Sequence, residues 1–208
     1  MFNPRFLIVS LGNQAPYYDC LHSAGHFALA SVQKVLGSSQ QPSFTSERYG
    51  RKACLASTGP TYIMVQSPTL MNVSGPWVAK TWREVLETYQ LKPSELSLLL
   101  VHDDLEEDLG RVRIRKWKAS HRGHNGIKSV NSNLKPADFP GSRWSRISIG
   151  IGRPEARDQM SVSDYVLKKM TRYQRDTIDT QVGPRVVGCL RELQEEWEEE
   201  YDKANPKL

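Results

Sequence analysis

Hydrophobic residues recur along the chain in two patterns, one typical of strands and one of helices. Short apolar or alternating runs of the strand type occupy residues 5–11, 48–57, 62–66, 96–101, 111–117 and 146–151. Helical spacing occupies residues 24–36, 77–89, 126–134 and 171–201. Gly37 ends the first of these helices, Pro76 precedes the second, and a break is expected near Gly183 in the last.

Strands that alternate with helices predict an α/β fold. We expect a single domain with a twisted, mixed (mostly parallel) sheet, flanked by helices on both faces. A chain of 208 residues is long enough to bury a complete core for one such domain. The expected division is an α/β domain over residues 1–191 and an acidic C-terminal helix or tail over residues 192–208.

Charge is distributed unevenly between these two parts. Residues 192–208 hold seven acidic and two basic residues, so residues 1–191 hold 26 basic and 16 acidic residues and carry a net charge of +10. A basic body favours a polyanionic partner such as a nucleic acid, although many basic proteins bind nothing of the kind. For the acidic segment we expect a solvated terminal helix rather than an element that binds a partner.

Composition narrows the class of protein further. No apolar run approaches the ~20 residues that a membrane-spanning helix needs, so no membrane partner is expected. The chain has three widely spaced cysteines, Cys20, Cys54 and Cys189, an odd number that indicates reduced thiols inside a cell. Residues 1–9 show neither a secretion signal nor an Arg/Ser-rich import segment.

Candidate chemistry is concentrated after the apolar run at residues 96–101. His102, Asp103 and Asp104 follow it directly, and His121 and His124 come some twenty residues later in a glycine-containing segment. A carboxylate beside imidazoles suits acid–base catalysis. The same residue types could hold zinc or iron, but their spacing matches no strong metal motif. The Gly-x-Ser-x-Gly motif of serine hydrolases and the glycine spacing of nucleotide-binding loops are both absent.

Six short segments, taken in order, resemble the bacterial-type peptidyl-tRNA hydrolase family over residues 6 to about 180. They are residues 7–13 (LIVSLGN), 22–25 (HSAG), 71–75 (MNVSG), 102–104 (HDD), 123–126 (GHNG) and 149–152 (IGIG). Each segment alone is a weak signal, and six in sequence are specific. The resemblance implies hydrolysis of the ester that joins a peptide to the 3′ end of tRNA, which recycles tRNA from stalled or aborted translation.

The resemblance also assigns roles to residues of this chain. His22 matches the catalytic histidine, which acts as a general base, and Asp103 matches the aspartate that orients it. Asn13, Asn72 and Asn125 match three asparagines of the site, and Met71 forms an apolar wall of the cleft. Either Tyr17 or Tyr18 corresponds to a tyrosine of the cleft. Taken singly, each of these residues could equally cap a turn or pack in the core.

A basic segment next to the site is expected to bind the acceptor stem of the tRNA. It comprises Arg111, Arg113, Arg115, Lys116, Lys118 and Arg122, and its alternation places three guanidinium groups on one strand face. Arg115 stands where the family has a basic residue near the 5′ phosphate, and His121 is expected to contact substrate. A second basic residue of the family is replaced here by Ser148, so the phosphate contact is expected from Arg146, Arg143 or Lys118 instead. The asparagine after the catalytic histidine is replaced by Ser23.

Two other functions compete with this interpretation. One is an RNA-binding paralogue that keeps the fold and the basic surface but no longer hydrolyses its ligand. The other is a different small hydrolase on the same scaffold, since a fold does not determine a function. The expected enzyme is a monomer that uses no metal and no organic cofactor. It acts inside the cell, in the cytoplasm or, as for eukaryotic members of the family, in an organelle such as the mitochondrion.

Overall fold

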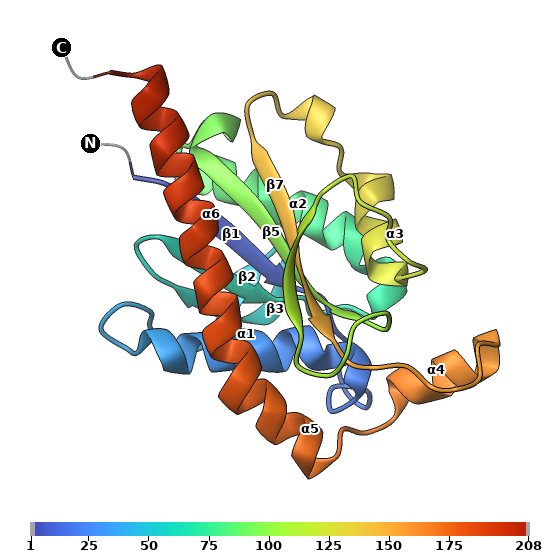
Figure 1. Cartoon of the computed structure of the whole chain (residues 1–208). Helices are drawn as coiled ribbons and strands as arrows, with labels where there is room; N and C mark the ends of the chain where they lie inside the picture. The colour runs from blue at the N-terminus through green and yellow to red at the C-terminus, as the bar shows by residue number, and fades with distance from the viewer. Residues whose placement is uncertain (1–2, 207–208) are drawn as a thin grey trace.

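Seven strands form a single sheet in the computed structural model, which describes residues 3–206. They are β1 (Arg5–Ser10), β2 (Thr45–Tyr49), β3 (Lys52–Thr58), β4 (Tyr62–Gln66), β5 (Leu96–Asp104), β6 (Val112–Lys116) and β7 (Arg143–Gly150). Their order across the sheet is β2-β3-β4-β1-β5-β7-β6 (Figure 1). The central strands β4, β1, β5 and β7 are parallel, and antiparallel strands complete both edges. The predicted mixed, mostly parallel sheet is confirmed.

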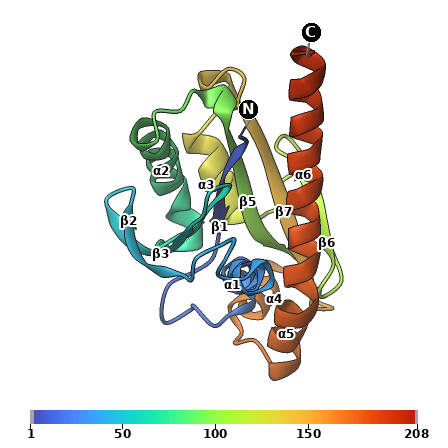
Figure 2. The same ribbon diagram turned by 90° about the vertical axis from the view of Figure 1, so that its left-hand side faces the viewer.

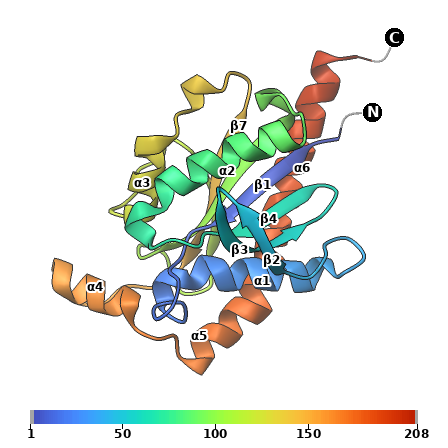
Figure 3. The same cartoon turned by 180° about the vertical axis from the view of Figure 1, so that it is seen from behind.

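Helices cover both faces of this sheet. They are α1 (Ala24–Leu36), α2 (Ser74–Thr88), α3 (Asn125–Asn133), α4 (Gln159–Leu167), α5 (Arg172–Thr177) and α6 (Gly183–Ala204). Figure 2 shows α2 and α3 on one side of the sheet and α6 on the other, and Figure 3 shows α2 crossing in front of the central strands. Short 3-10 turns, η1 (Leu21–Ser23) and η2 (Met71–Val73), precede α1 and α2.

The central strand β5 explains how one sheet supports two cores. All nine of its residues are buried, and successive side chains point to opposite faces. Leu99 and Val101 therefore join the core beneath α1 and α6, whereas Leu98 and Leu100 join the core beneath α2 and α3. Because β1, β4, β5 and β7 are parallel, their carboxyl ends meet at one edge of the sheet, where sites of open α/β folds form.

Several elements of the structure differ from those expected from the sequence. The single strand expected over residues 48–57 is two strands, β2 and β3, separated by a turn at Gly50 and Arg51 that both adopt positive φ angles. The strand expected to end at Val101 continues to Asp104, so Asp103 is held by strand pairing with Ile149. Helix α4 was not expected from the sequence, because its only buried residue is Val166 and no apolar face marks it.

The C-terminal helical region has no break at Gly183. Helix α5 leads through a π-helical segment, η5 (Ile178–Val182), directly into α6. Gly183 serves close packing instead, because a Cβ atom at this position would overlap with Ser31 of α1. The glycine thus allows α6 to approach α1, and the regular α-helix is interrupted just before it by the π-helical segment rather than ended.

The acidic segment after residue 191 forms the second half of α6. Trp197 is buried there, and its ring packs edge-on against Phe6 of β1 with 5.4 Å between the centroids. Glu200 pairs with Arg143 of β7. The division between residues 1–191 and 192–208 stays a prediction, and α6 passes through it without interruption. Within residues 3–206, no helix is both long enough and apolar enough to cross a membrane.

Candidate active site

A histidine and an aspartate that are 81 residues apart in the sequence meet at the carboxyl edge of the sheet. His22 lies in η1, at the entrance to α1, and its Nδ1 is 2.8 Å from Oδ1 and 2.9 Å from Oδ2 of Asp103. Asp103 is buried near the end of β5 and accepts this bond, so Nδ1 carries the proton. The other ring nitrogen of His22, Nε2, is then left with a free lone pair.

His124 gives the same carboxylate a second imidazole contact. Its Nε2 lies 3.1 Å from Oδ1 of Asp103, and the centroid of its ring is 5.0 Å from that of His22. His124 is also the N-cap of α3, because its Nδ1 accepts a hydrogen bond from the backbone N–H of Ile127. An Nδ1 that accepts leaves the proton on Nε2, so the neutral ring donates to Asp103.

Burial and these contacts shift the pKa values of the carboxylate and of the three histidines around it in different directions. Burial works against ionisation of Asp103, but the charges of His22 and His124 and their hydrogen bonds outweigh it and hold the pKa of this carboxyl far below its ordinary value. Burial also works to lower the pKa of His22, but the charge of Asp103 and its hydrogen bond together outweigh burial, so the pKa is raised. Burial lowers the pKa of His124, and it lowers the pKa of His102 to about 3.

The directions of these pKa shifts set the protonation states of the cluster near pH 7. His102 and His124 stay neutral near pH 7, while Asp103 stays ionised. His22 is thus the histidine of this cluster whose pKa is raised, and its neutral imidazole is the group best suited to act as a general base for hydrolysis.

The predicted asparagines surround a cleft of about 580 Å³ beside this pair. Asn13 follows β1 and is buried, and its Oδ1 accepts a hydrogen bond from the backbone N–H of Met71 at 2.9 Å. Asn72, in η2, and Asn125, the first residue of α3, line the cleft together with Met71. The structure therefore brings together segments that the sequence keeps more than fifty residues apart.

Of the two candidate tyrosines, only Tyr17 lines the cleft. It is 44% exposed, and Ser23 Oγ donates a hydrogen bond to its backbone oxygen while accepting one from the backbone N–H of Asn13. The serine that replaces the family's asparagine thus fixes the loop before His22. Tyr18 points elsewhere, since its hydroxyl donates to Gln66 and its ring stacks on His26.

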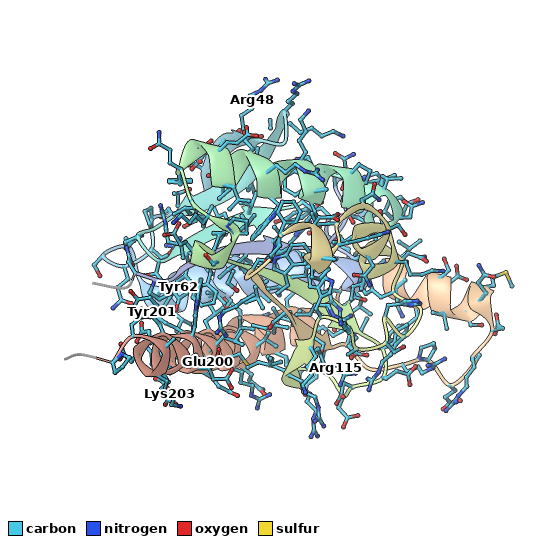
Figure 4. The ribbon with its side chains drawn as sticks, turned by 90° about the horizontal axis from the view of Figure 1, so that it is seen from above. Arg48, Tyr62, Arg115, Glu200, Tyr201 and Lys203 are labelled. Carbon is cyan, nitrogen blue, oxygen red and sulfur yellow. The ribbon has the colours of Figure 1, made fainter. Side chains whose placement is uncertain are left out.

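The basic segment divides into residues that are paired and residues that are free to bind. Arg111 and Arg113 both contact Glu107, and Arg122 contacts Asp104 and Glu107. Among the described residues, Arg115, Lys116 and Lys118 form no ion pair. Arg115 and His121 line the cleft, whereas Lys118 and Arg113 do not. Figure 4 shows Arg115 at the β6 edge, with Arg48 on the opposite side of the molecule.

Several residues of the cleft were not expected from the sequence. Helix α4 contributes Val162, Val166 and Leu167 to its wall, and it projects from the body of the molecule (Figure 1). Arg153 also lines the cleft, and so does Arg146, which the sequence had suggested as a replacement phosphate ligand. The contact between His124 and Asp103 had one sequence signal, the placement of a histidine two residues before the predicted helix at residues 126–134.

His22, Asp103 and His124 also have the composition of a metal site, with their ligand atoms within 4.8 Å of one another. A metal-bound histidine normally donates a hydrogen bond from its second ring nitrogen. His124 does the reverse, since its Nδ1 accepts from Ile127 and its Nε2 carries the proton. His102 donates from Nδ1 to the backbone oxygen of Asp103 and contributes no ligand to the set. The arrangement fits hydrogen bonding to the carboxylate better than metal coordination.

The fold and the cleft define a class, an open-sheet α/β protein with a histidine–carboxylate pair equipped for general-base hydrolysis. The sequence model of the peptidyl-tRNA hydrolase family matches residues 7–207. This chain belongs to the peptidyl-tRNA hydrolase family.

Individual relatives are similar over most of the chain. A peptidyl-tRNA hydrolase from Sulfurihydrogenibium sp. is 38% identical over 181 residues, which cover 83% of this chain and 82% of the relative. A probable peptidyl-tRNA hydrolase from Schizosaccharomyces pombe is 38% identical over 141 residues, covering 66% of this chain and 64% of the relative. The crystal structure of peptidyl-tRNA hydrolase from Acinetobacter baumannii matches with a TM-score of 0.63 and 26% identity, over 88% of this chain and 84% of that one.

Proposed function

We propose that this chain hydrolyses the ester between the peptide and the 3′ ribose of peptidyl-tRNA, with His22 as the general base. The observation that carries the proposal is the contact of His22 Nδ1 with both oxygens of Asp103, beside a cleft lined by three asparagines. In the first step Nε2 of His22 takes a proton from a water molecule as its oxygen attacks the ester carbonyl.

The second step returns that proton. The tetrahedral intermediate collapses, the bond from the carbonyl carbon to the ribose oxygen breaks, and the imidazolium of His22 protonates the leaving 3′ oxygen. Asp103 stabilises the imidazolium and keeps the ring in the Nδ1–H tautomer throughout. General-base assistance contributes on the order of 10²–10⁴ in rate, and positioning and stabilisation of the oxyanion supply the rest.

The asparagines divide the remaining tasks. The Oδ1 of Asn13 is used by the backbone of Met71, and its Nδ2 donates to Cys20 Sγ at 4.0 Å. The second N–H of the amide remains to face water or the ester. Asn72 and Asn125 are proposed to hold the peptide backbone and the terminal ribose, and Tyr17 and Met71 to contact the peptide. Tyr18 has a structural role in this proposal, because its hydroxyl and ring are both engaged away from the cleft.

The acceptor stem of the tRNA is proposed to lie along the β6 edge. Arg115, Lys118 and His121 would bind its phosphates or the 3′ end, and Arg113 would join them when phosphate competes with Glu107. We further propose a monomer that acts inside the cell, in the cytoplasm or in mitochondria. Its cysteines support a reducing compartment, since Cys20, Cys54 and Cys189 are all free thiols.

Release of peptide from purified N-blocked aminoacyl-tRNA under single-turnover conditions tests the proposal. The wild-type protein should release the peptide, and His22→Ala should lower the rate by about 10²–10⁴ while leaving affinity for tRNA nearly intact. Binding without release by the wild-type protein would favour a catalytically silent RNA-binding paralogue. Cleavage of simple esters that is insensitive to salt, without release from tRNA, would favour a different hydrolase.

A further inference from the structure

Arg146, in the middle of β7, is a buried arginine that the proposed reaction does not use. Its side chain is among the largest fully buried ones and is only 1% exposed. Its neighbours Ile147 and Ile149 face the core under α1 and α6, so Arg146 faces the side of α3 together with Trp144. In strand register it lies between Leu100 of β5 and Arg115 of β6.

The charge of Arg146 has no carboxylate partner among residues 3–206. Burial lowers the pKa of its guanidinium, the charge of Arg115 lowers it further, and only Asp104 acts to raise it. Its Nε is buried and makes no hydrogen bond within the described chain. A buried cation is costly unless polar groups compensate it, so the contacts that it does make must be important for the local structure.

Those contacts are two backbone carbonyl oxygens of a single turn. Nη2 of Arg146 donates to the oxygen of Lys116 at 3.2 Å and to that of Ala119 at 2.5 Å. The same turn is closed by a bond from the backbone N–H of Ala119 to the oxygen of Lys116 at 3.0 Å. Arg146 thus ties both ends of the turn at residues 116–119 to the sheet.

This turn connects the two parts of the proposed site. Before it, β6 presents Arg115 at the cleft, and after it the chain delivers His124 to Asp103 and Asn125 to the cleft wall. The far end of the same loop is held separately, by the ion pair between Arg122 and Asp104. A shift of the turn at residues 116–119 would therefore move RNA-facing and catalytic groups together.

We infer that Arg146 is a positioning residue, which holds the turn at residues 116–119 so that the loop ending in His124 and Asn125 is placed for catalysis. Its guanidinium acts on the protein backbone and not on a phosphate of the substrate. The kinetic consequences rest on the proposed hydrolysis of peptidyl-tRNA, whereas the structural consequence can be measured in the free protein.

Hydrogen exchange and kinetics of Arg146→Met test the inference, since methionine keeps much of the volume but removes the donors. Exchange of backbone amides at residues 116–124 should accelerate in the free protein, and kcat should fall roughly 10- to 100-fold because catalytic groups are misplaced. The slope of log(kcat/KM) against log(salt concentration) should stay at the wild-type value. Arg146→Lys, which keeps charge and donors, should restore slow exchange and most of kcat.

Arg115→Met is the matched control, because Arg115 is the register neighbour of Arg146 and forms no ion pair in the described chain. It should leave the exchange of residues 116–124 slow and reduce the salt slope by about 0.7–0.9, the change for one lost phosphate contact. If Arg146→Met reduces the salt slope like this control and leaves exchange unchanged, Arg146 is a phosphate ligand and the inference is wrong. Unchanged exchange together with unchanged kcat also overturns it. Absence of turnover by the wild-type protein would refute the proposed function alone, since the exchange result stands without it.

Discussion

Asp103 is a buried carboxylate that serves two imidazoles at once. His22 occupies both of its oxygens and His124 shares one of them, so neither the rotation nor the ionisation of the carboxylate is free to vary. This arrangement makes the protonation of His22 depend on its burial and, in the opposite direction, on the charge and hydrogen bond of Asp103.

The pH profile of Asp103→Asn should report this dependence. The base must be neutral, so kcat/KM of the wild-type protein should rise with pH through the pKa of His22, which Asp103 raises above its ordinary value. Removal of the carboxylate's charge leaves burial as the dominant influence, so the rising limb should move to lower pH while the maximal rate falls. A limb that stays in place would show that another group controls the profile.

At the scale of single residues, the approach of His22 to Asp103 was expected only through the family resemblance. Nothing in their spacing indicates contact, because the contact depends on the parallel pairing of β1 with β5. The role of His124 depends on how α3 docks on the sheet, and the choice of Tyr17 over Tyr18 depends on the path of the loop before η1. Such tertiary placements leave no local pattern in a sequence.

Regular elements were easier to predict where one face is buried. The bounds of α1 were predicted without error, because its apolar spacing ends at Gly37, which adopts a positive φ angle. Helix α4 had no such signal, since solvent and the cleft surround most of it. The turn between β2 and β3 was missed because Arg51 adopts a positive φ angle. Residues other than glycine rarely adopt this conformation, so an arginine does not predict it.

The basic residues in strand β6 and directly before it differ in whether an acidic side chain pairs with them. Glu107 neutralises Arg111 and Arg113, whereas Arg115 is left for an external anion. Arg115→Ala should therefore raise KM for peptidyl-tRNA more than it lowers kcat. Arg111→Ala should raise KM much less, since its charge is already paired.

Steady-state measurements of Arg115→Ala and Arg111→Ala over a range of salt concentrations would compare them. The difference between the variants should shrink at high salt, because counterions compete for the same phosphates. Equal effects of the two substitutions would contradict the assignment, and so would a loss confined to kcat in Arg115→Ala.

For the whole molecule, buried neutral histidines make the free energy of unfolding depend on pH. Burial lowers the pKa of His26 to about 4 and that of His102 to about 3. As the pH falls below about 6.5, the unfolded chain protonates these residues and the folded chain does not, so stability is lost toward pH 4. The limiting loss is about 1.4 kcal/mol per pH unit for each histidine. His22, whose pKa is raised, adds stability only as the pH falls through its folded pKa toward about 6.5, and it adds no further slope below that value.

Urea unfolding at about pH 7 and about pH 5.5 should show this decrease in the free energy of unfolding. His26→Gln should reduce the decrease between the two pH values, whatever its effect at neutral pH, because one of the titrating groups is gone. A free energy of unfolding that is constant or increases toward the lower pH would contradict the expectation.

The start of β1 and the end of α6 lie at the same end of the molecule (Figure 1). The cleft lies at the other end, because it is built on the carboxyl edge of the parallel strands. A tether or fluorescent tag fused to either terminus would therefore leave the cleft unobstructed. The protein could be immobilised by either end on a sensor surface with its RNA-facing edge turned to the solution.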